Sequence, residues 1–123
     1  MEIVDANIVL RYLLKDHNRL YHESKQILER NAIHIPTEVI AEIVYVLEKV
    51  YNVPANRISE ALTKLLDYPN ITTPDNAVCY ESLTIYNSEN IDFVDALLVC
   101  YNRIHGAIIH TFDKKVQKLC RAE

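Results

Sequence analysis

The chain opens with MEIVDANIVLRYLL at residues 1–14, in which a short aliphatic run ends at Asp5 and apolar residues then recur at helical spacing. Similar short runs, each closed by Pro, Asp or Asn, return three more times along the chain. Runs of this length are too short for helices and are typical of buried strands. We therefore predict strands at Glu2–Asp5, Ala32–Ile35, Ile71–Thr73 and Ala107–Phe112.

Between these runs, apolar residues recur three and four positions apart, which is the spacing of one helix face. This spacing predicts helices at Ile8–Leu14, Thr37–Val50, Arg57–Leu66, Ala77–Tyr86, Asp92–His105 and Lys114–Leu119. A single glycine, Gly106, leaves little material for tight hairpin turns, so neighbouring strands should be joined by helical crossovers. We expect an α/β fold of three layers, with a short, mainly parallel sheet flanked by helices.

The composition is that of an ordinary globular chain, with 123 residues, 50% of them hydrophobic and 24% charged. This size predicts one domain over residues 1–123. The formal net charge of -4 lacks the basic footprint of a protein that coats duplex nucleic acid. Three cysteines without CxxC spacing argue against a disulfide framework or a zinc site and favour a reducing cytoplasm. Because no apolar run approaches ~18 residues and no basic leader is present, we expect neither a membrane span nor export.

Four carboxylates occupy positions that suit chemistry. Asp5 and Asp113 each follow a predicted strand, at the sheet edge where parallel sheets bind ligands, although each could serve only as a helix N-cap. Glu42 and Asp95 are lone carboxylates within apolar helical runs, where burial without a cation is costly. An ion pair with Arg or Lys, or a narrow solvent-exposed strip of the helix, would also accommodate these two residues.

One divalent cation at the carboxyl edge of the sheet would explain all four carboxylates at once. Oxygen-only ligation favours Mg²⁺ or Mn²⁺ over zinc, which prefers His and Cys. Asp92 lies three residues before Asp95 and would share its helix face, so it is a further candidate ligand. Because carboxylate-held Mg²⁺ generally serves phosphate substrates, hydrolysis of a phosphodiester bond is the leading reaction.

Four segments of the chain together resemble the acidic motifs of PIN-domain proteins, in the same order. They are Ile3–Leu13, the helix around Glu42, Ile91–Leu98 and Thr111–Asp113. The size is similar to that of the VapC-type toxins of toxin–antitoxin pairs. The resemblance implies a Mg²⁺- or Mn²⁺-dependent endoribonuclease that acts on RNA, forms a homodimer and is inhibited by a cognate antitoxin.

The resemblance also implies roles for single positions. The matching residues are Asp5, Glu42 and Asp95 for the core catalytic and metal-binding acids, Asp113 for the fourth acid, Asp92 for a less fixed acid, and Asn7 and Thr111 for supporting polar residues. Three basic residues are candidate contacts for RNA phosphates, with a solvated charged surface as the alternative. They are Arg11 in the first predicted helix and Lys114 and Lys115 in the last.

Three other functions compete with this interpretation. A haloacid-dehalogenase-like phosphotransferase needs a second carboxylate two residues after Asp5, where this chain has Asn7. A receiver-like signalling domain needs a lysine late in the sheet, where this chain has Asp113. The last alternative is a PIN-like interaction module without significant catalysis, which only a metal-dependent cleavage assay can separate from a nuclease.

Overall fold

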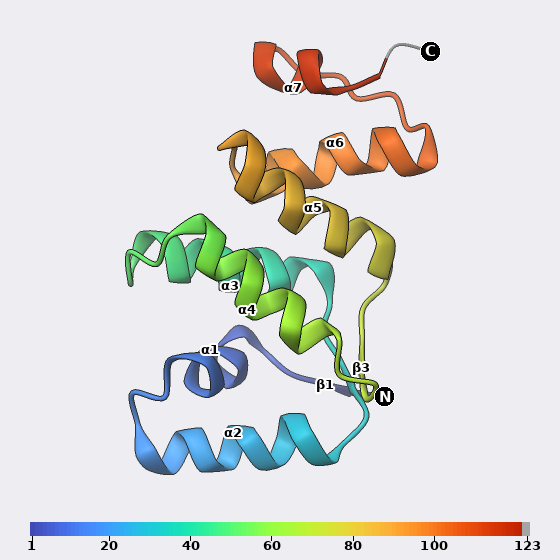
Figure 1. Ribbon diagram of the computed structural model, residues 1–123. Coiled ribbons are helices and arrows are strands. Elements are labelled where there is room, and N and C mark those ends of the chain that lie inside the picture. The colour runs from blue at the N-terminus through green and yellow to red at the C-terminus, as the bar shows by residue number, and fades with distance from the viewer. Residues whose placement is uncertain (122–123) are drawn as a thin grey trace. The chain divides into compact units, whose positions relative to one another are not determined.

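The computed structural model describes residues 1–121, which are mostly helical (Figure 1). The chain divides into two compact units, Met1–Pro74 and the part from Asp75 onward. The first unit contains β1 (Glu2–Ile3), α1 (Ala6–Leu14), α2 (Asn18–Arg30), β2 (Ile33–His34), α3 (Thr37–Lys49), α4 (Ala55–Leu66) and β3 (Ile71–Thr72). The second contains α5 (Asn76–Glu89), α6 (Phe93–His105) and α7 (Lys114–Leu119). Within residues 1–121, no helix has the length and apolar character needed to cross a membrane.

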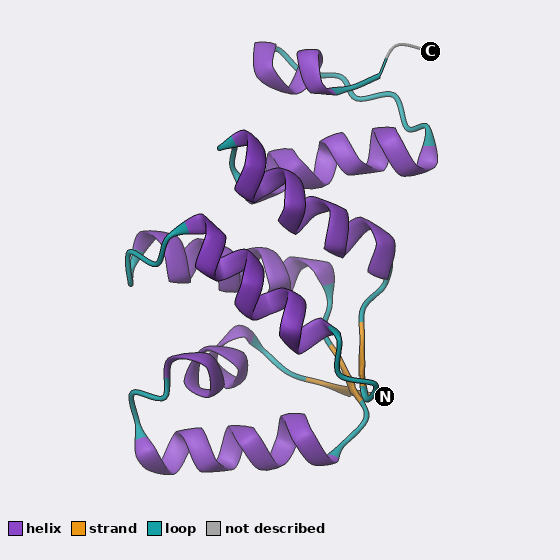
Figure 2. Cartoon of the chain, viewed as in Figure 1, coloured by secondary structure: helices purple, strands orange, loops and turns teal. Residues whose placement is uncertain are grey.

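The three strands form one parallel sheet in the order β1, β2, β3 (Figure 2). Glu2 pairs with Ile33, and Ile33 pairs in turn with Ile71. Two helices connect each pair of neighbouring strands, α1 and α2 before β2, and α3 and α4 before β3. Parallel neighbours cannot be joined by a tight turn and therefore require such crossovers. The α/β class and the parallel sheet predicted from the sequence are confirmed.

The helices of the first unit share an aliphatic core. Within this unit α1 packs against α2 and α3, and α3 packs against α4, as Figure 1 shows. Val9, Leu28, Ile43 and Ile58 are completely buried between these helices and the sheet. This packing fixes the directions of α1 and α3, the two helices of this unit that carry candidate acids.

In the second unit, α5 packs against α6, and α6 packs against α7. The helix α6 ends at Gly106, whose φ of 69° lies in the left-handed region that favours glycine. Just before this end, the buried side-chain amide of Asn102 forms hydrogen bonds with the chain before and after α7. Its Nδ2 donates to the carbonyl of Ala107 (3.0 Å), and its Oδ1 accepts from the N–H of Arg121 (2.8 Å).

The predicted strand at Ala107–Phe112 is wrong, because this segment has no regular secondary structure. Half-buried and exposed side chains alternate along it as in a strand, and Phe112 is fully exposed. The described part of the second unit contains no strand, however, so a ladder cannot form within it. Side-chain amides bind the segment instead, since Asn102 donates to its first carbonyl and Gln117 Nε2 donates to that of Thr111 (2.7 Å).

The sequence pattern did not predict α2, which is largely polar. Its inner face runs through the half-buried Leu20 and the buried Ser24 and Leu28, at helical spacing. Ser24 is 2% exposed and occupies a place where the apolar pattern needs an aliphatic residue. A template that accepts a small polar residue on the inner face would have found this helix.

Candidate active site

Asp5 lies between β1 and α1 and serves as the N-cap of α1. The N–H of Ile8 donates to Asp5 Oδ1 (3.2 Å), while Oδ2 makes no hydrogen bond within residues 1–121. Capping therefore occupies one carboxylate oxygen and leaves the other exposed. Asn7 is exposed in the first turn of the same helix. The N-cap function expected as an alternative is present, and it leaves an oxygen available for a ligand.

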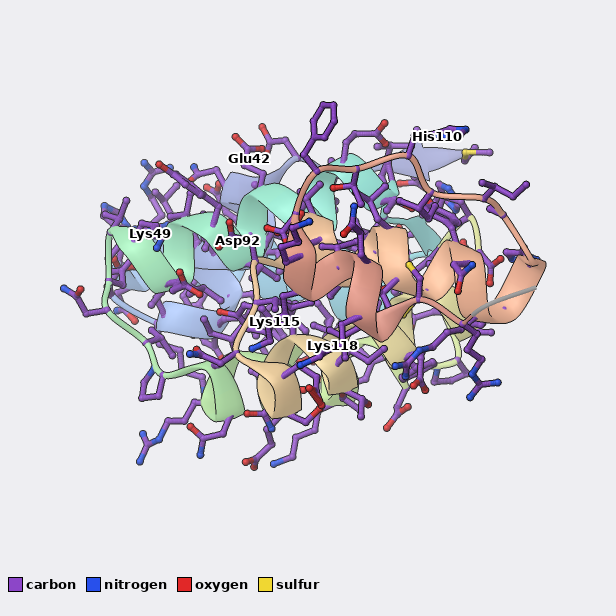
Figure 3. The ribbon with its side chains drawn as sticks, turned by 90° about the horizontal axis from the view of Figure 1, so that it is seen from above. Glu42, Lys49, Asp92, His110, Lys115 and Lys118 are labelled. Carbon is purple, nitrogen blue, oxygen red and sulfur yellow. The ribbon has the colours of Figure 1, made fainter. Side chains whose placement is uncertain are left out.

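Glu42 lies on an exposed face of α3, so the expectation of a carboxylate buried in an apolar helix is wrong. The helix buries Ile40, Ile43 and Val44 on its inner side and leaves Glu42 and Tyr45 exposed. Figure 3 shows Glu42 and Lys49 along the same helix. Seven residues correspond to about 10 Å of helix rise, and Lys49 pairs with Glu48, so it does not neutralise Glu42. The exposed strip considered as an alternative is the arrangement observed.

Three acids of the second unit interact electrostatically. Asp95 is half-buried in the first turn of α6, Asp92 is exposed just before that helix, and Asp113 is the N-cap of α7. The N–H of Val116 donates to Asp113 Oδ1 (2.9 Å). Burial, followed by the negative charges of Asp113 and Asp92, raises the pKa of Asp95 above its ordinary value. These carboxylates are thus close enough to repel one another.

Thr111 holds the backbone of Asp113. Its Oγ1 accepts from the N–H of Asp113 (3.0 Å), and its carbonyl accepts from Gln117 Nε2 one turn into α7. These bonds restrain the turn that precedes α7 and therefore the direction of the Asp113 carboxylate. A supporting role of Thr111 in the site stays a prediction.

Within residues 1–121, none of the five candidate acids forms an ion pair with Lys, Arg or His. The Arg or Lys partner considered for Glu42 and Asp95 is therefore absent from the described chain. Nor do the described residues contain a group of three or more His, Cys, Asp or Glu side chains placed to hold a metal ion. The chemistry of the donors nevertheless fits a hard divalent cation, because they are carboxylates without a neutralising partner.

The three basic residues expected to contact RNA phosphates differ in whether they already bind other groups of the chain. Arg11 Nη1 donates to both oxygens of Asp16 (2.8 and 2.7 Å), and its Nη2 donates to the hydroxyl of Tyr51 (3.0 Å). The Nζ of Lys115, labelled on α7 in Figure 3, donates to the carbonyl of Glu89 at the end of α5. Lys114 is exposed and has no partner within the described residues. Of the three, Lys114 is the most available for a phosphate.

The model of the PIN domain family matches residues 3–122, across both compact units. No curated protein sequence matches the chain. The family match decides against the receiver-like and haloacid-dehalogenase-like alternatives.

Proposed function

The chain belongs to the PIN-domain family, and from this we propose that it is a metal-dependent endoribonuclease, the toxin of a two-component toxin–antitoxin module. PIN domains are typically nucleases that act on RNA and use divalent metals. The observation that carries the proposal is a set of carboxylates without cationic partners in the described chain, in a sequence that the family model matches over residues 3–122. We further propose that residues 1–123 act as one PIN domain.

Five carboxylates are proposed to hold Mg²⁺ or Mn²⁺. They are Asp5, Glu42, Asp95 and Asp113, with Asp92 as an additional ligand. When bound, such a cation neutralises phosphate charge, activates water and stabilises the leaving oxygen. The chain itself orients the carboxylates, because helix capping fixes Asp5 and Asp113, and Asp95 is held by the packed first turn of α6.

Substrate RNA must approach a chain of formal net charge -4. Lys114 is proposed to contact its phosphates, since this side chain is exposed at the start of α7 next to Asp113. Arg11 and Lys115 are proposed as further contacts, although each also binds a group of its own unit. Asn7 is proposed to support the site beside Asp5.

The proposed function is tested with the purified chain, free of any partner, and defined RNAs. We expect internal cleavage in Mg²⁺ or Mn²⁺, loss of cleavage in EDTA and recovery when the metal is restored. Glu23→Gln is the matched control, because Glu23 is an exposed carboxylate paired only with Arg19. Cleavage that survives EDTA would contradict metal dependence, and the absence of cleavage with either metal would favour the interaction module.

The toxin role has its own test. We expect expression of the chain in bacterial cytoplasm to arrest growth, and Asp95→Asn to abolish the arrest at equal protein level. Sedimentation of the purified chain tests the proposed homodimer. Growth arrest by the Asp95→Asn variant would show that toxicity does not come from RNA cleavage.

A further inference from the structure

The first unit contains a cavity of about 590 Å³ in which no candidate acid takes part. It lies among the ends of α1 and α3, the start of α2 and the length of α4. Leu13, at the cavity, is eight residues beyond Asp5, which corresponds to about 12 Å along α1. The cavity is therefore separate from the carboxylate of Asp5.

Aliphatic side chains make up much of the cavity wall. In this wall Leu13 and Leu14 of α1 and Val53 of the loop after α3 are half-buried, whereas Leu47, Ile58 and Leu65 are buried. A volume of this order lies within the range of ligand sites, which is about 300–1,000 Å³. A wall of this kind suits branched aliphatic side chains.

Tyr12 and Tyr68 place polar groups in this apolar wall. The hydroxyl of Tyr12 donates to Glu29 Oε2 (2.6 Å) and lies 2.7 Å from the hydroxyl of Tyr68. The single hydroxyl proton of Tyr12 is used in the bond to Glu29. The Tyr68 hydroxyl must therefore be the donor in the bond between the two tyrosines. Burial, with the bond to Glu29 as the next cause, raises the pKa of Tyr12, so this hydroxyl stays protonated. The two hydroxyls therefore form a hydrogen-bonded pair within the apolar wall.

The rim of the cavity is positively charged. Lys15, Arg57 and Lys64 line it, against the single carboxylate of Glu60. Lys64 pairs with Glu60 (3.1 Å), whereas Arg57 has no partner within residues 1–121. Cations outnumber carboxylates here even when Glu29, behind Tyr12, is counted. On a chain of formal net charge -4, this local excess favours a ligand that carries carboxylates.

A nucleobase fits the cavity less well than a peptide. The rings of Tyr12 and Tyr21 already stack on each other, with centroids 6.0 Å apart and planes 10° apart. Lys15 lies over the Tyr21 ring at 5.6 Å from its centroid. These contacts occupy faces on which a base would stack. The aliphatic wall and basic rim together suit aliphatic side chains flanked by Asp or Glu.

We propose that this cavity binds an amphipathic peptide segment of a partner protein, with aliphatic residues against Leu13, Leu14 and Val53 and carboxylates against Lys15 and Arg57. This is a helix-in-groove or extended-segment mode of recognition, in which apolar anchors supply affinity and rim charges supply selectivity. The inference does not depend on nuclease activity, because no candidate acid lines the cavity.

A random peptide display library, selected on the full-length protein, tests the proposal. We expect enriched peptides to be rich in Leu, Ile, Asp and Glu, and their synthetic forms to bind about tenfold or more weakly to Lys15→Glu/Arg57→Glu. Ala61→Met, which fills the cavity without a change of charge, should also weaken binding. Arg19→Glu/Arg30→Glu is the matched control, since it makes the same charge change on exposed α2 positions outside the cavity.

The alternative occupants are outcomes of the same experiment. NMR shifts at Leu13, Val53 and Tyr68 on addition of the selected peptide would support the proposal. Enrichment of basic peptides, equal binding to Lys15→Glu/Arg57→Glu, or no enrichment would overturn it. So would a labelled single-stranded RNA, added in EDTA, that shifts these residues and competes with the peptide. A dimer that Lys15→Glu/Arg57→Glu dissociates would assign the cavity to a second copy of the chain.

Discussion

Asp95 concentrates the electrostatic cost of the candidate site in one side chain. Burial and the negative charges of Asp113 and Asp92 raise its pKa. A bound cation would offset this unfavourable environment of the ionised carboxylate. Asp95→Asn keeps the shape and removes the charge, and we expect RNA cleavage to fall about a hundredfold or more. Asp5→Asn should have the same effect with little loss of helix stability, because Asn caps helices as well as Asp does. Cleavage rates and far-UV circular dichroism measure both effects.

Two further variants make this comparison specific. Asp92→Asn should lower the cleavage rate less than Asp95→Asn, because Asp92 is exposed and belongs to the less fixed position. Glu23→Gln should leave the rate unchanged. Full cleavage by the Asp5 or Asp95 variant would contradict the assignment of these residues, and an equal loss at positions 92 and 95 would make Asp92 an equal ligand.

Asp75 gives a pH dependence that is independent of the candidate site. It accepts from the N–H of Val78 (3.1 Å) and lies 2.6 Å from His105 Nε2, and these bonds hold its pKa below the ordinary 3.8. A lowered folded-state pKa contributes stability that is fully present above the unfolded value and is lost as pH falls through the folded value. We expect Asp75→Asn, which keeps a capping oxygen, to lower Tm at neutral pH and to flatten the loss of Tm in acid. Thermal unfolding across the acid range measures this, and identical pH profiles for the two proteins would contradict it.

At the scale of elements, the predictions succeeded where local signals agreed. The helix at Lys114–Leu119 has the predicted bounds, because Asp113 caps it and Val116 is its buried residue. The helix predicted from Asp92 begins one residue later, since Asp92 is its cap. Three of the four predicted strands are in place but shrink to two residues each, and the one predicted at Ala107–Phe112 does not form. Strand length depends on pairing partners, which local sequence does not contain.

The candidate site was also predictable only where its features depend on local sequence. The capping roles of Asp5 and Asp113 follow from their places between a strand-like run and a helix. The exposure of Glu42 could not be read from its apolar neighbours, because Val39 and Val46 are only half-buried and one face of α3 remains open. The repulsion between Asp95 and Asp113 depends on the packing of α7 against α6, which is a tertiary contact.

Asn102 is the element-scale anchor of α7, because its buried amide binds chain on both sides of that helix. Asn102→Ala leaves the part-buried carbonyl of Ala107 and the N–H of Arg121 without their partners, and we expect a loss of about 1–3 kcal/mol in the free energy of unfolding. Urea unfolding measures the loss, and hydrogen exchange in α7 should accelerate. Asn87→Ala, at an exposed position of α5, is the control and should change neither. Unchanged exchange in α7 with Asn102→Ala would show that packing alone holds this helix.

At the scale of the whole molecule, a cation bound by the proposed carboxylates should stabilise the folded state. A ligand that binds only the folded state stabilises it by RT ln(1 + [L]/Kd), which is about 2.7 kcal/mol at one hundred times Kd. We therefore expect Mn²⁺ to raise Tm in a single transition, and Asp5→Asn and Asp95→Asn each to reduce that rise. Differential scanning calorimetry measures it. If Mn²⁺ has the same effect on the wild type and both variants, the acids do not share a site, and two separate transitions would contradict the proposal of one domain.

The net charge of -4 also bears on how the proposed toxin is inhibited. Carboxylates without cationic partners in the described chain, together with the exposed Glu42 and Tyr45 of α3, suit a partner that offers both an apolar face and a cation. We expect the antitoxin, sought as the product of an adjacent gene, to lay its C-terminal segment against α1 and α3. An Arg or Lys of that segment should reach toward Asp5, Glu42 and Asp95. Such a charge-assisted contact competes with the metal for the same oxygens.

Replacement of that basic residue by Glu reverses its charge. This variant distinguishes competition with the metal from steric blocking of the RNA path. Binding should weaken modestly, because the apolar anchors of the segment remain, whereas RNA cleavage should recover strongly at equal occupancy of the antitoxin. Titration calorimetry fixes the occupancy, and cleavage of a defined RNA in Mg²⁺ reports the activity. A reversal at an exposed basic position elsewhere on the antitoxin is the control and should leave inhibition intact. If the reversed antitoxin still inhibits at equal occupancy, inhibition acts through steric cover of the RNA path, because the cation that competes with the metal has been removed.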